Sequence, residues 1–215
     1  MKNSLIAGAG LIATLLTTGL AMAQTSRMDS DLVGRTSKVE FDRMNKEGAE
    51  TVALITPTSA KLSKQDEGLM MEVAMGGMMQ LETSQVAVQK STNPEVREMA
   101  QAEIEEQTGL AAKLKEIASA KGITLPAAPD TKTQEMVSKM QGMEPAALER
   151  HYVQEHAVKG HETLDKVMSK VESKGKDTDL MAVAKAAHPL VKTHLKVARE
   201  LNAKLRSGNT STSGR

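Results

Sequence analysis

Apolar residues recur at alternating spacings of three and four along most of the chain after residue 65, which is the spacing of one face of an α-helix. The pattern is clearest in two segments: Val153, Ala157, Gly160, Leu164, Val167 and Val171, then Val183, Ala187, Leu190, Val191, Ala198, Leu201 and Leu205. No segment shows the sustained alternation of apolar and polar residues that is typical of a half-buried strand. The pattern therefore predicts an all-α fold.

Helix-start and helix-stop residues divide this region into four long helices. Ser63 and Asn93-Pro94 are typical of helix starts, and Gly122 is typical of a helix end. Asp177 or Thr178 is expected to cap the last helix, and Pro145 lies in the first turn of the third. The predicted spans are about 65–91, 94–121, 145–174 and 178–206. Because the links are short, we predict an antiparallel four-helix bundle over residues 65–206.

Two details modify this bundle. A short amphipathic helix is predicted at about 132–141, between the second and third long helices, and it should end at Gly142. Pro189 lies inside the fourth helix, where it removes a backbone hydrogen bond and predicts a kink near Lys185.

The two ends of the chain lack this pattern. Residues 1–23 resemble a secretory signal peptide, with Lys2, an apolar stretch and the cleavage sequence Ala21-Met22-Ala23. We therefore expect an exported protein, in the periplasm or peripheral to the outer membrane. Residues 24–64 are polar and predict a linker or loosely docked arm, with a short helix allowed at 39–46. Residues 207–215 predict a disordered tail.

Composition removes several functional classes. Cleavage of the signal would leave 27 basic and 27 acidic residues, and only Phe41 and Tyr152 are aromatic, so nucleic acid is not an expected partner. The absence of cysteine excludes disulfides, thiolate metal sites and cysteine-linked lipid. No later apolar stretch reaches the ~20 residues of a membrane span. An envelope protein remains open as a partner.

Polar residues interrupt the apolar face of every long helix. Glu82 interrupts the first, Glu103 and Gln107 the second, His161 the third and His194 the fourth. Buried carboxylates and imidazoles are costly unless they are paired or bind a metal. One hypothesis is a site for a divalent metal such as Zn or Fe; the alternative is a hydrogen-bonded polar layer that fixes helix register.

Known catalytic motifs are missing. No histidine has a glutamate three residues before it, as the di-iron motif requires, and no His-Glu-x-x-His sequence occurs. A Gly-x-Ser-x-Gly elbow, a phosphate loop and a cysteine nucleophile are also absent. We therefore expect a protein that is not an enzyme.

Methionine offers an alternative function. Five of the 15 methionines fall within ten residues: Met70, Met71, Met75, Met78 and Met79. In an oxidising envelope such thioethers bind Cu(I) or consume oxidants. The same spacing also suits methionines that fill gaps in a core.

Four segments together resemble the exported bacterial family known as domain of unknown function 4142: GGMMQLETSQVAVQKS, NPEVREMAQAEIEEQTGLAAKLKEIASAKGITLP, LERHYVQEHAVKGHETL and HPLVKTHLKVAREL. The resemblance covers about 66–205 and implies a ferritin-like four-helix bundle. Members of the family often carry the label of outer membrane protein.

The resemblance also implies site residues. Glu82, His161 and His194 match the family pattern, whereas Gln80 replaces a glutamate and Glu106-Gln107 replaces an Asp-His pair. The spacing from Tyr152 to His161 is one residue longer than in the pattern. The resemblance thus implies a degenerate metal site of reduced affinity, with Glu103 or Gln107 helping. We expect a binding or envelope stress-related protein; a structural or oxidant-buffering role is the alternative.

Overall fold

The computed structural model describes residues 31–212, with side chains through Ser207, and the predicted signal peptide lies outside these residues. A two-stranded antiparallel ribbon, β1 (Leu32–Val33) and β2 (Thr36–Ser37), precedes the helices. The helices are α2 (Lys38–Ala53), α3 (Lys64–Lys90), α4 (Pro94–Lys121), α5 (Thr131–Gln141), α6 (Pro145–His151), the π-helix η1 (Tyr152–Val158), α7 (Lys159–Lys174) and α8 (Thr178–Thr212).

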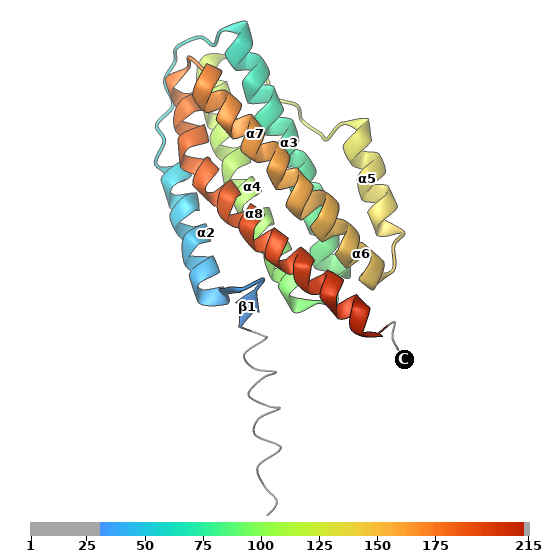
Figure 1. The fold of residues 1–215 in the computed structure, drawn as a ribbon. Helices are drawn as coiled ribbons and strands as arrows, with labels where there is room; N and C mark the ends of the chain where they lie inside the picture. Colours follow the sequence, from blue (N-terminus) through green and yellow to red (C-terminus); the bar gives the residue numbers. More distant parts are fainter. Residues whose placement is uncertain (1–30, 213–215) are drawn as a thin grey trace, which may run out of the picture. The chain divides into compact units, whose positions relative to one another are not determined.

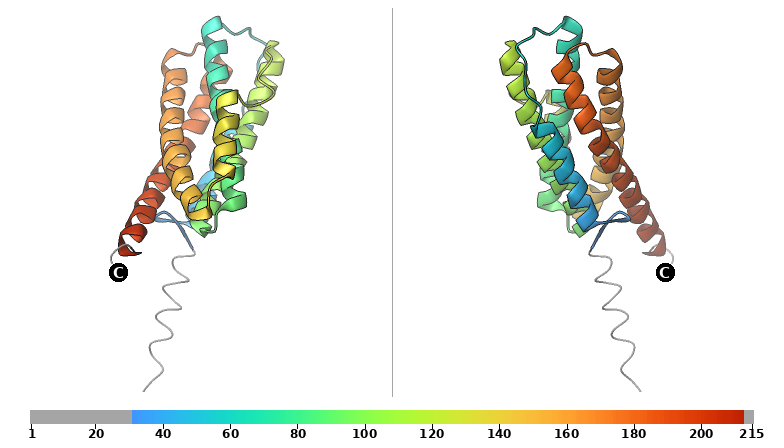
Figure 2. Two further views of the ribbon diagram at one scale, coloured as in Figure 1. Left: turned by 90° about the vertical axis from the view of Figure 1, so that its right-hand side faces the viewer. Right: turned by 90° about the vertical axis from the view of Figure 1, so that its left-hand side faces the viewer.

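The long helices lie side by side, and the all-α class is confirmed (Figures 1 and 2). α3 packs along α4 and α7, and α8 packs along α7 and α4. The predicted caps form: the side chains of Ser63 and Asn93 accept backbone N–H groups of the first turns of α3 and α4. Gly122 ends α4 with a φ of 71°, a conformation that glycine adopts without strain. The short helix also forms, as α5 against α3.

The predicted third helix consists of three parts, because the π-helix η1 separates α6 from α7. At its end the N–H of Lys159 donates to the carbonyl of Gln154, five residues earlier. An i→i+5 bond encloses one residue more than the bond of an α-helix. This π-helix lies between Tyr152 and His161, the segment in which the family resemblance implies one additional residue.

Helix α2 differs from the predicted linker or loosely docked arm. It packs against α4 and α8, and Phe41 is completely buried among residues of those helices. Ser37 caps the helix by accepting the N–H of Glu40. Only Phe41 and Val52 of its 16 residues are buried, so its apolar periodicity is too weak to predict a packed helix.

The last helix is longer than predicted. α8 continues to Thr212, beyond the expected end at Arg206, so residues 207–212 are helical where a disordered tail was predicted. Pro189 lies inside α8, and the kink near Lys185 stays a prediction. Among residues 31–212, none of the helices combines the length and the apolar character of a membrane span.

The core has two apolar clusters, one nearer each end of the long helices. One contains Leu110, Leu164 and Val191, together with residues of α3. The other contains Phe41 and Tyr152 with residues of α3, α4 and α8. Along each helix a buried polar segment lies between them, and this segment holds the candidate site described below.

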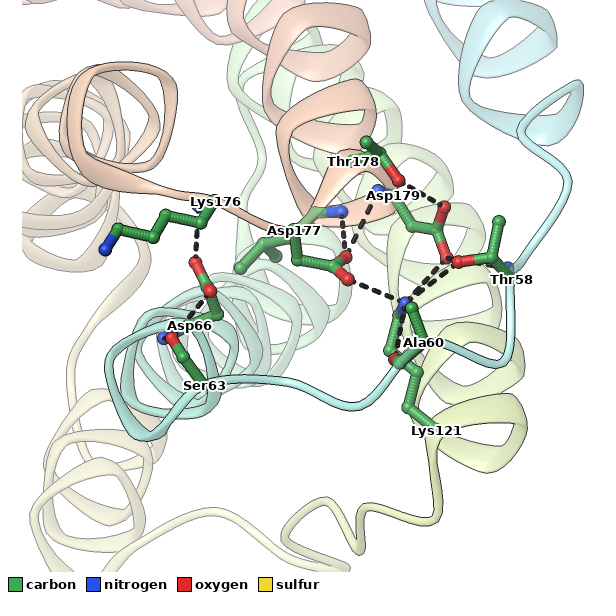
Figure 3. Close-up of polar contacts among 10 residues, drawn as sticks. Thr58, Ala60, Ser63, Asp66, Lys121, Lys176, Asp177, Thr178 and Asp179 are labelled. Carbon is green, nitrogen blue, oxygen red and sulfur yellow. Dashed lines mark hydrogen bonds and ion pairs between the residues drawn. The ribbon is translucent and has the colours of Figure 1, made fainter.

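A buried lysine joins the end of α4 to the start of α8 (Figure 3). Nζ of Lys121 lies 2.7 Å from Oδ2 of Asp177 and 2.9 Å from Oδ2 of Asp179, and it also donates to Oγ1 of Thr58 and the carbonyl of Ala60. Burial lowers the pKa of Lys121, but the two aspartates outweigh burial and raise the pKa overall. These contacts fix the 54–63 connection against the helix ends.

Candidate metal centre

Four buried side chains from three helices meet between the two apolar clusters. They are Glu103 and Glu106 of α4, His161 of α7 and His194 of α8, and one atom of each lies within 4.8 Å of one atom of every other. Glu103 and Glu106 are three residues apart, a spacing that places both carboxylates on one face of α4. The arrangement presents two oxygen and two nitrogen ligands to one point.

The distances show that these atoms face a shared point. Oε2 of Glu103 lies 2.8 Å from Nε2 of His161 and 3.1 Å from Nδ1 of His194. Oε2 of Glu106 lies 2.8 Å from Nδ1 of His194. Yet Nε2 of His161 and Oε2 of Glu106 have no partner in hydrogen-bond geometry within the part of the chain that the structure describes. Close ligand atoms that are not aligned with one another are expected around a common ion.

The opposite nitrogen of each histidine is held by an oxygen. Nδ1 of His161 lies 2.6 Å from the carbonyl oxygen of Ala157, and Nε2 of His194 lies 2.6 Å from Oδ1 of Asn45. Both oxygens only accept, so the proton of each neutral imidazole is on the nitrogen that faces them. The other nitrogen then directs its lone pair toward the glutamates, as in histidines that bind metals.

The charges of the cluster depend on one another. Burial raises the pKa of Glu103, but the adjacent His161 and His194 outweigh burial and hold that pKa below its ordinary value. Burial lowers the pKa of His194, but the carboxylates of Glu106 and Glu103 outweigh burial and raise this pKa to about 10. Without a cation, the two carboxylates thus favour the protonated form of His194.

Two buried amides border the cluster. Nε2 of Gln107 donates to Oε1 of Glu103 over 2.9 Å, which orients that carboxylate. Nε2 of Gln80 donates to the carbonyl of His156 in the π-helix over 3.2 Å and lies 3.3 Å from Nδ1 of His161. A Cβ at residue 160 would lie 2.5 Å from Oε1 of Gln80, so this close approach requires Gly160.

The structure brings together three of the five residues predicted from the sequence as ligands, Glu103, His161 and His194. Gln107 lies beside Glu103 rather than among the four converging groups. Glu82 is only half-buried and is not one of the four. On α3 the buried polar side chain that contacts His161 is instead Gln80, which is 1% exposed.

Glu106 was missed as a candidate ligand. Its sequence signal is the three-residue separation from Glu103, which places it on the same face as that carboxylate. In the family resemblance, Glu106 appears only as the residue that stands in place of the aspartate of the Asp-His pair.

A surface pocket reaches the cluster from the side of α2. It has a volume of about 400 Å³ and lies between α2 and α4. Asn45 and Glu106 line it on the side of the cluster, and further carboxylates line it as well: Asp42, Glu98 and Glu105. Lys38 and Lys46 line the pocket too, and Lys38 pairs with Asp42 and Glu98, so the opening carries charges of both signs.

Comparison with known families agrees with the sequence resemblance. The model of the family described as domain of unknown function DUF4142 matches residues 52–201, most of the chain. The chain belongs to this family. The comparison of this chain with curated proteins gives no match, and the comparison with solved structures gives none either. Since no function is established for DUF4142, function has to be argued from the geometry of this member.

Proposed function

We propose that this DUF4142 protein binds one divalent transition-metal ion, Zn²⁺ or Fe²⁺, between Glu103, Glu106, His161 and His194. The main support is the convergence of four buried ligand atoms. Two of these atoms, Nε2 of His161 and Oε2 of Glu106, make close contacts that lack hydrogen-bond geometry. The oxygens that hold the outer histidine nitrogens give further support, because such contacts orient metal-binding imidazoles.

Charge balance favours the same ion. Two carboxylates and two neutral imidazoles around a divalent cation make a site of zero net charge, which suits a buried position. A tetrahedral ion with bonds of 2.0–2.2 Å separates its ligands by about 3.4 Å. The contacts of 2.8–3.1 Å would widen by about 0.3–0.6 Å to reach this separation, and all four ligand atoms already lie within 4.8 Å of one another. Two nitrogen and two oxygen ligands suit Zn²⁺ and Fe²⁺.

The cellular role that fits is metal binding without catalysis in the cell envelope. The signal-like residues 1–23 support export, and the lack of catalytic motifs supports a binding role. The ligands are buried, and the pocket that borders Glu106 is lined mainly by charged side chains.

The test compares two isosteric variants in purified protein. We expect about one equivalent of Zn²⁺ or Fe²⁺ by elemental analysis and a higher melting temperature on adding the ion. Glu106→Gln should weaken binding by about 100-fold, because it removes a charged ligand. Glu82→Gln changes charge equally but lies outside the cluster, so it should keep wild-type affinity. Wild-type protein with no stoichiometric metal, and a melting temperature unchanged by Zn²⁺, Fe²⁺ or Mn²⁺, would establish the polar-layer alternative.

The methionines support a second candidate function, oxidant buffering. Met71, Met75, Met78 and Met79 are only half-buried, whereas Met70 is fully buried. Exposed thioethers oxidise first, so dilute peroxide should convert these four to sulfoxides before Met70, as peptide mass spectrometry would show. Equal or slower oxidation of the four would rule out this candidate. Binding of Cu(I) by the same thioethers is a minor alternative to oxidant buffering.

A further inference from the structure

Helix α2 covers one side of the ligand cluster. Glu103, His161 and His194 are completely buried, so an ion reaches them only when a neighbouring part of the protein moves. Helix α2 lies at the edge of the bundle against α4 and α8 (Figure 1), and its Asn45 contacts His194 directly. The question is therefore whether α2 is the part that moves.

The packing of α2 is weaker than that of the helices that supply ligands. Only Phe41 and Val52 of its 16 residues are buried, whereas α7, which has the same length, buries five residues. The ion pair that joins α2 to α4, between Lys38 and Glu98, is partly exposed and contributes little to stability. Elements with few buried apolar contacts open at a low free-energy cost.

Two voids lie beneath α2, one on each side of Glu106. The pocket of about 400 Å³ lies between α2 and α4, and a cavity of about 20 Å³ is lined by Gly48 of α2 and Leu190 of α8. Glu106 lines both, and the smaller cavity has room for a single water molecule. Side chains that border a void lack dispersion contacts on that side, so the separation of α2 from its neighbours costs less here.

Helix α2 is built to move as a unit and to return to the same place. Arg43 bonds to Glu40 and Glu47 within the helix, and these pairs are kept when the helix leaves its neighbours. Both flanking segments are fixed to the bundle. The N–H of Gly34 donates to a carboxylate of α4 over 2.9 Å, and the N–H of Thr58 donates to a carboxylate of α8 over 2.7 Å.

We propose that α2 is a lid over the metal centre, which opens to load or release the ion and closes with Asn45 against His194. The inference rests on the proposed metal binding and concerns its regulation: the rate of ion exchange is set by the opening of α2. While the lid is closed, the bound ion has no contact with water, and an ion of moderate affinity is retained for long times.

A disulfide between α2 and α8 tests the lid. A Cβ at residue 48 would lie 3.2 Å from Cβ of Leu190, close to the separation of about 3.8 Å in a disulfide. The chain has no cysteine of its own, so Gly48→Cys/Leu190→Cys forms this bond without competing thiols. The control is Gly48→Ser/Leu190→Ser, which has side chains of similar size and no crosslink. Zn²⁺ uptake and Zn²⁺ transfer to a chromogenic chelator are followed by stopped flow.

The crosslinked protein should bind Zn²⁺ at equilibrium as the serine control does, but load and release it about tenfold more slowly or worse. Bound Zn²⁺ that exchanges at the same rate in both proteins would overturn the lid and leave the metal centre intact. The absence of stoichiometric Zn²⁺ from both proteins and from wild type would refute the metal centre, and the lid with it.

Loosening the lid should have the opposite effect. Phe41→Ala removes the largest buried side chain of α2, and Met140→Ala removes a fully buried side chain of α5, far from this lid in the chain. Phe41→Ala should accelerate both uptake and release about tenfold, because a lid controls both directions, and Met140→Ala should change neither. Faster release without faster uptake would point to a weakened contact with His194 and contradict the lid, as would equal acceleration in the two variants.

Discussion

Asn45 and His194 are 149 residues apart in the chain, yet Nε2 of His194 donates to Oδ1 of Asn45 across 2.6 Å. The contact joins α2, which the sequence did not predict to be packed, to the centre of the ligand cluster. It fixes the proton of His194 on Nε2 and leaves Nδ1 free to face Glu103 and Glu106. Helix α2 therefore contributes to the site without supplying a ligand.

Removal of this acceptor should weaken metal binding. We expect Asn45→Ala to reduce affinity for Zn²⁺ about 10- to 100-fold, the usual effect of losing a partner that orients a ligating histidine. Asn45→Asp keeps an oxygen acceptor and should stay within a few-fold of wild type. Competition with a chromogenic chelator measures both; wild-type affinity in Asn45→Ala would show that the contact does not orient the histidine.

Lys121 should be a main determinant of stability. Lys121→Met leaves Asp177 and Asp179 buried without their cation, and loss of one partner of a buried pair costs about 3–5 kcal/mol. Lys115 is exposed on the same helix, so Lys115→Met should change the free energy of unfolding by less than about 0.5 kcal/mol. Urea denaturation followed by circular dichroism measures the difference, and equal stabilities would contradict the assigned role.

Glu149 should make stability depend on acid pH. Oε1 of this buried glutamate accepts the backbone N–H groups of Thr92 and Asn93 and the hydroxyl of Ser91 in the turn between α3 and α4. Burial raises the pKa of Glu149, but these donors outweigh burial and lower it below the ordinary value of 4.5. The stabilisation is therefore complete above about pH 4.5 and is lost as the pH falls through the lower folded-state pKa.

The matching variant is Glu149→Gln, which should lower the free energy of unfolding at pH 7 by about 1–3 kcal/mol. The deficit should shrink as the pH is reduced below 4.5, where wild type loses the same contribution. Glu144→Gln makes the same charge change at an exposed position whose side chain forms no cap hydrogen bond, and it should have little effect. Thermal melts at several pH values test this, and a deficit independent of pH would refute it.

Two glycines should respond in opposite ways to alanine. A Cβ at residue 160 would lie 2.5 Å from Oε1 of Gln80, so Gly160→Ala should destabilise the protein by about 1–3 kcal/mol. Around Gly109 of α4 nothing lies within 4 Å of the added Cβ, and Gly109→Ala should stabilise by roughly 0.5–1 kcal/mol. Denaturant titrations check the signs, and similar effects at both sites would contradict the close packing of Gln80.

The ends of the helices were predictable because local chemistry determines them. Ser63, Asn93-Pro94 and Gly122 act within one turn of their own positions, so the sequence alone locates α3 and α4 to within a residue or two. The packing of α2 was not predictable in this way. Its one large buried side chain, Phe41, finds its partners in helices far along the chain.

The question of which side of α3 is buried shows a second limit of prediction from the sequence. Two lines of residues run along nearly opposite sides of this helix, one through Met71, Met75, Met78 and Glu82 and the other through Met70, Val73, Ala74, Gln80 and Thr83. Both contain apolar residues at helical spacing. The structure buries the second line, because Gly76 and Gly77 let neighbouring helices approach there. Sequence periodicity could not choose between them, which is why Glu82 was predicted in place of Gln80.

The π-helix determines how this chain tolerates a change in length. One additional residue in a uniform α-helix would rotate everything beyond it by about 100° and turn His161 away from Glu103. Because η1 takes up that residue in its wider turns, Leu148 before it and Leu164 after it both remain buried. Loss of one residue between 152 and 158 should therefore convert the wide turn to ordinary helix while the imidazole of His161 keeps its direction.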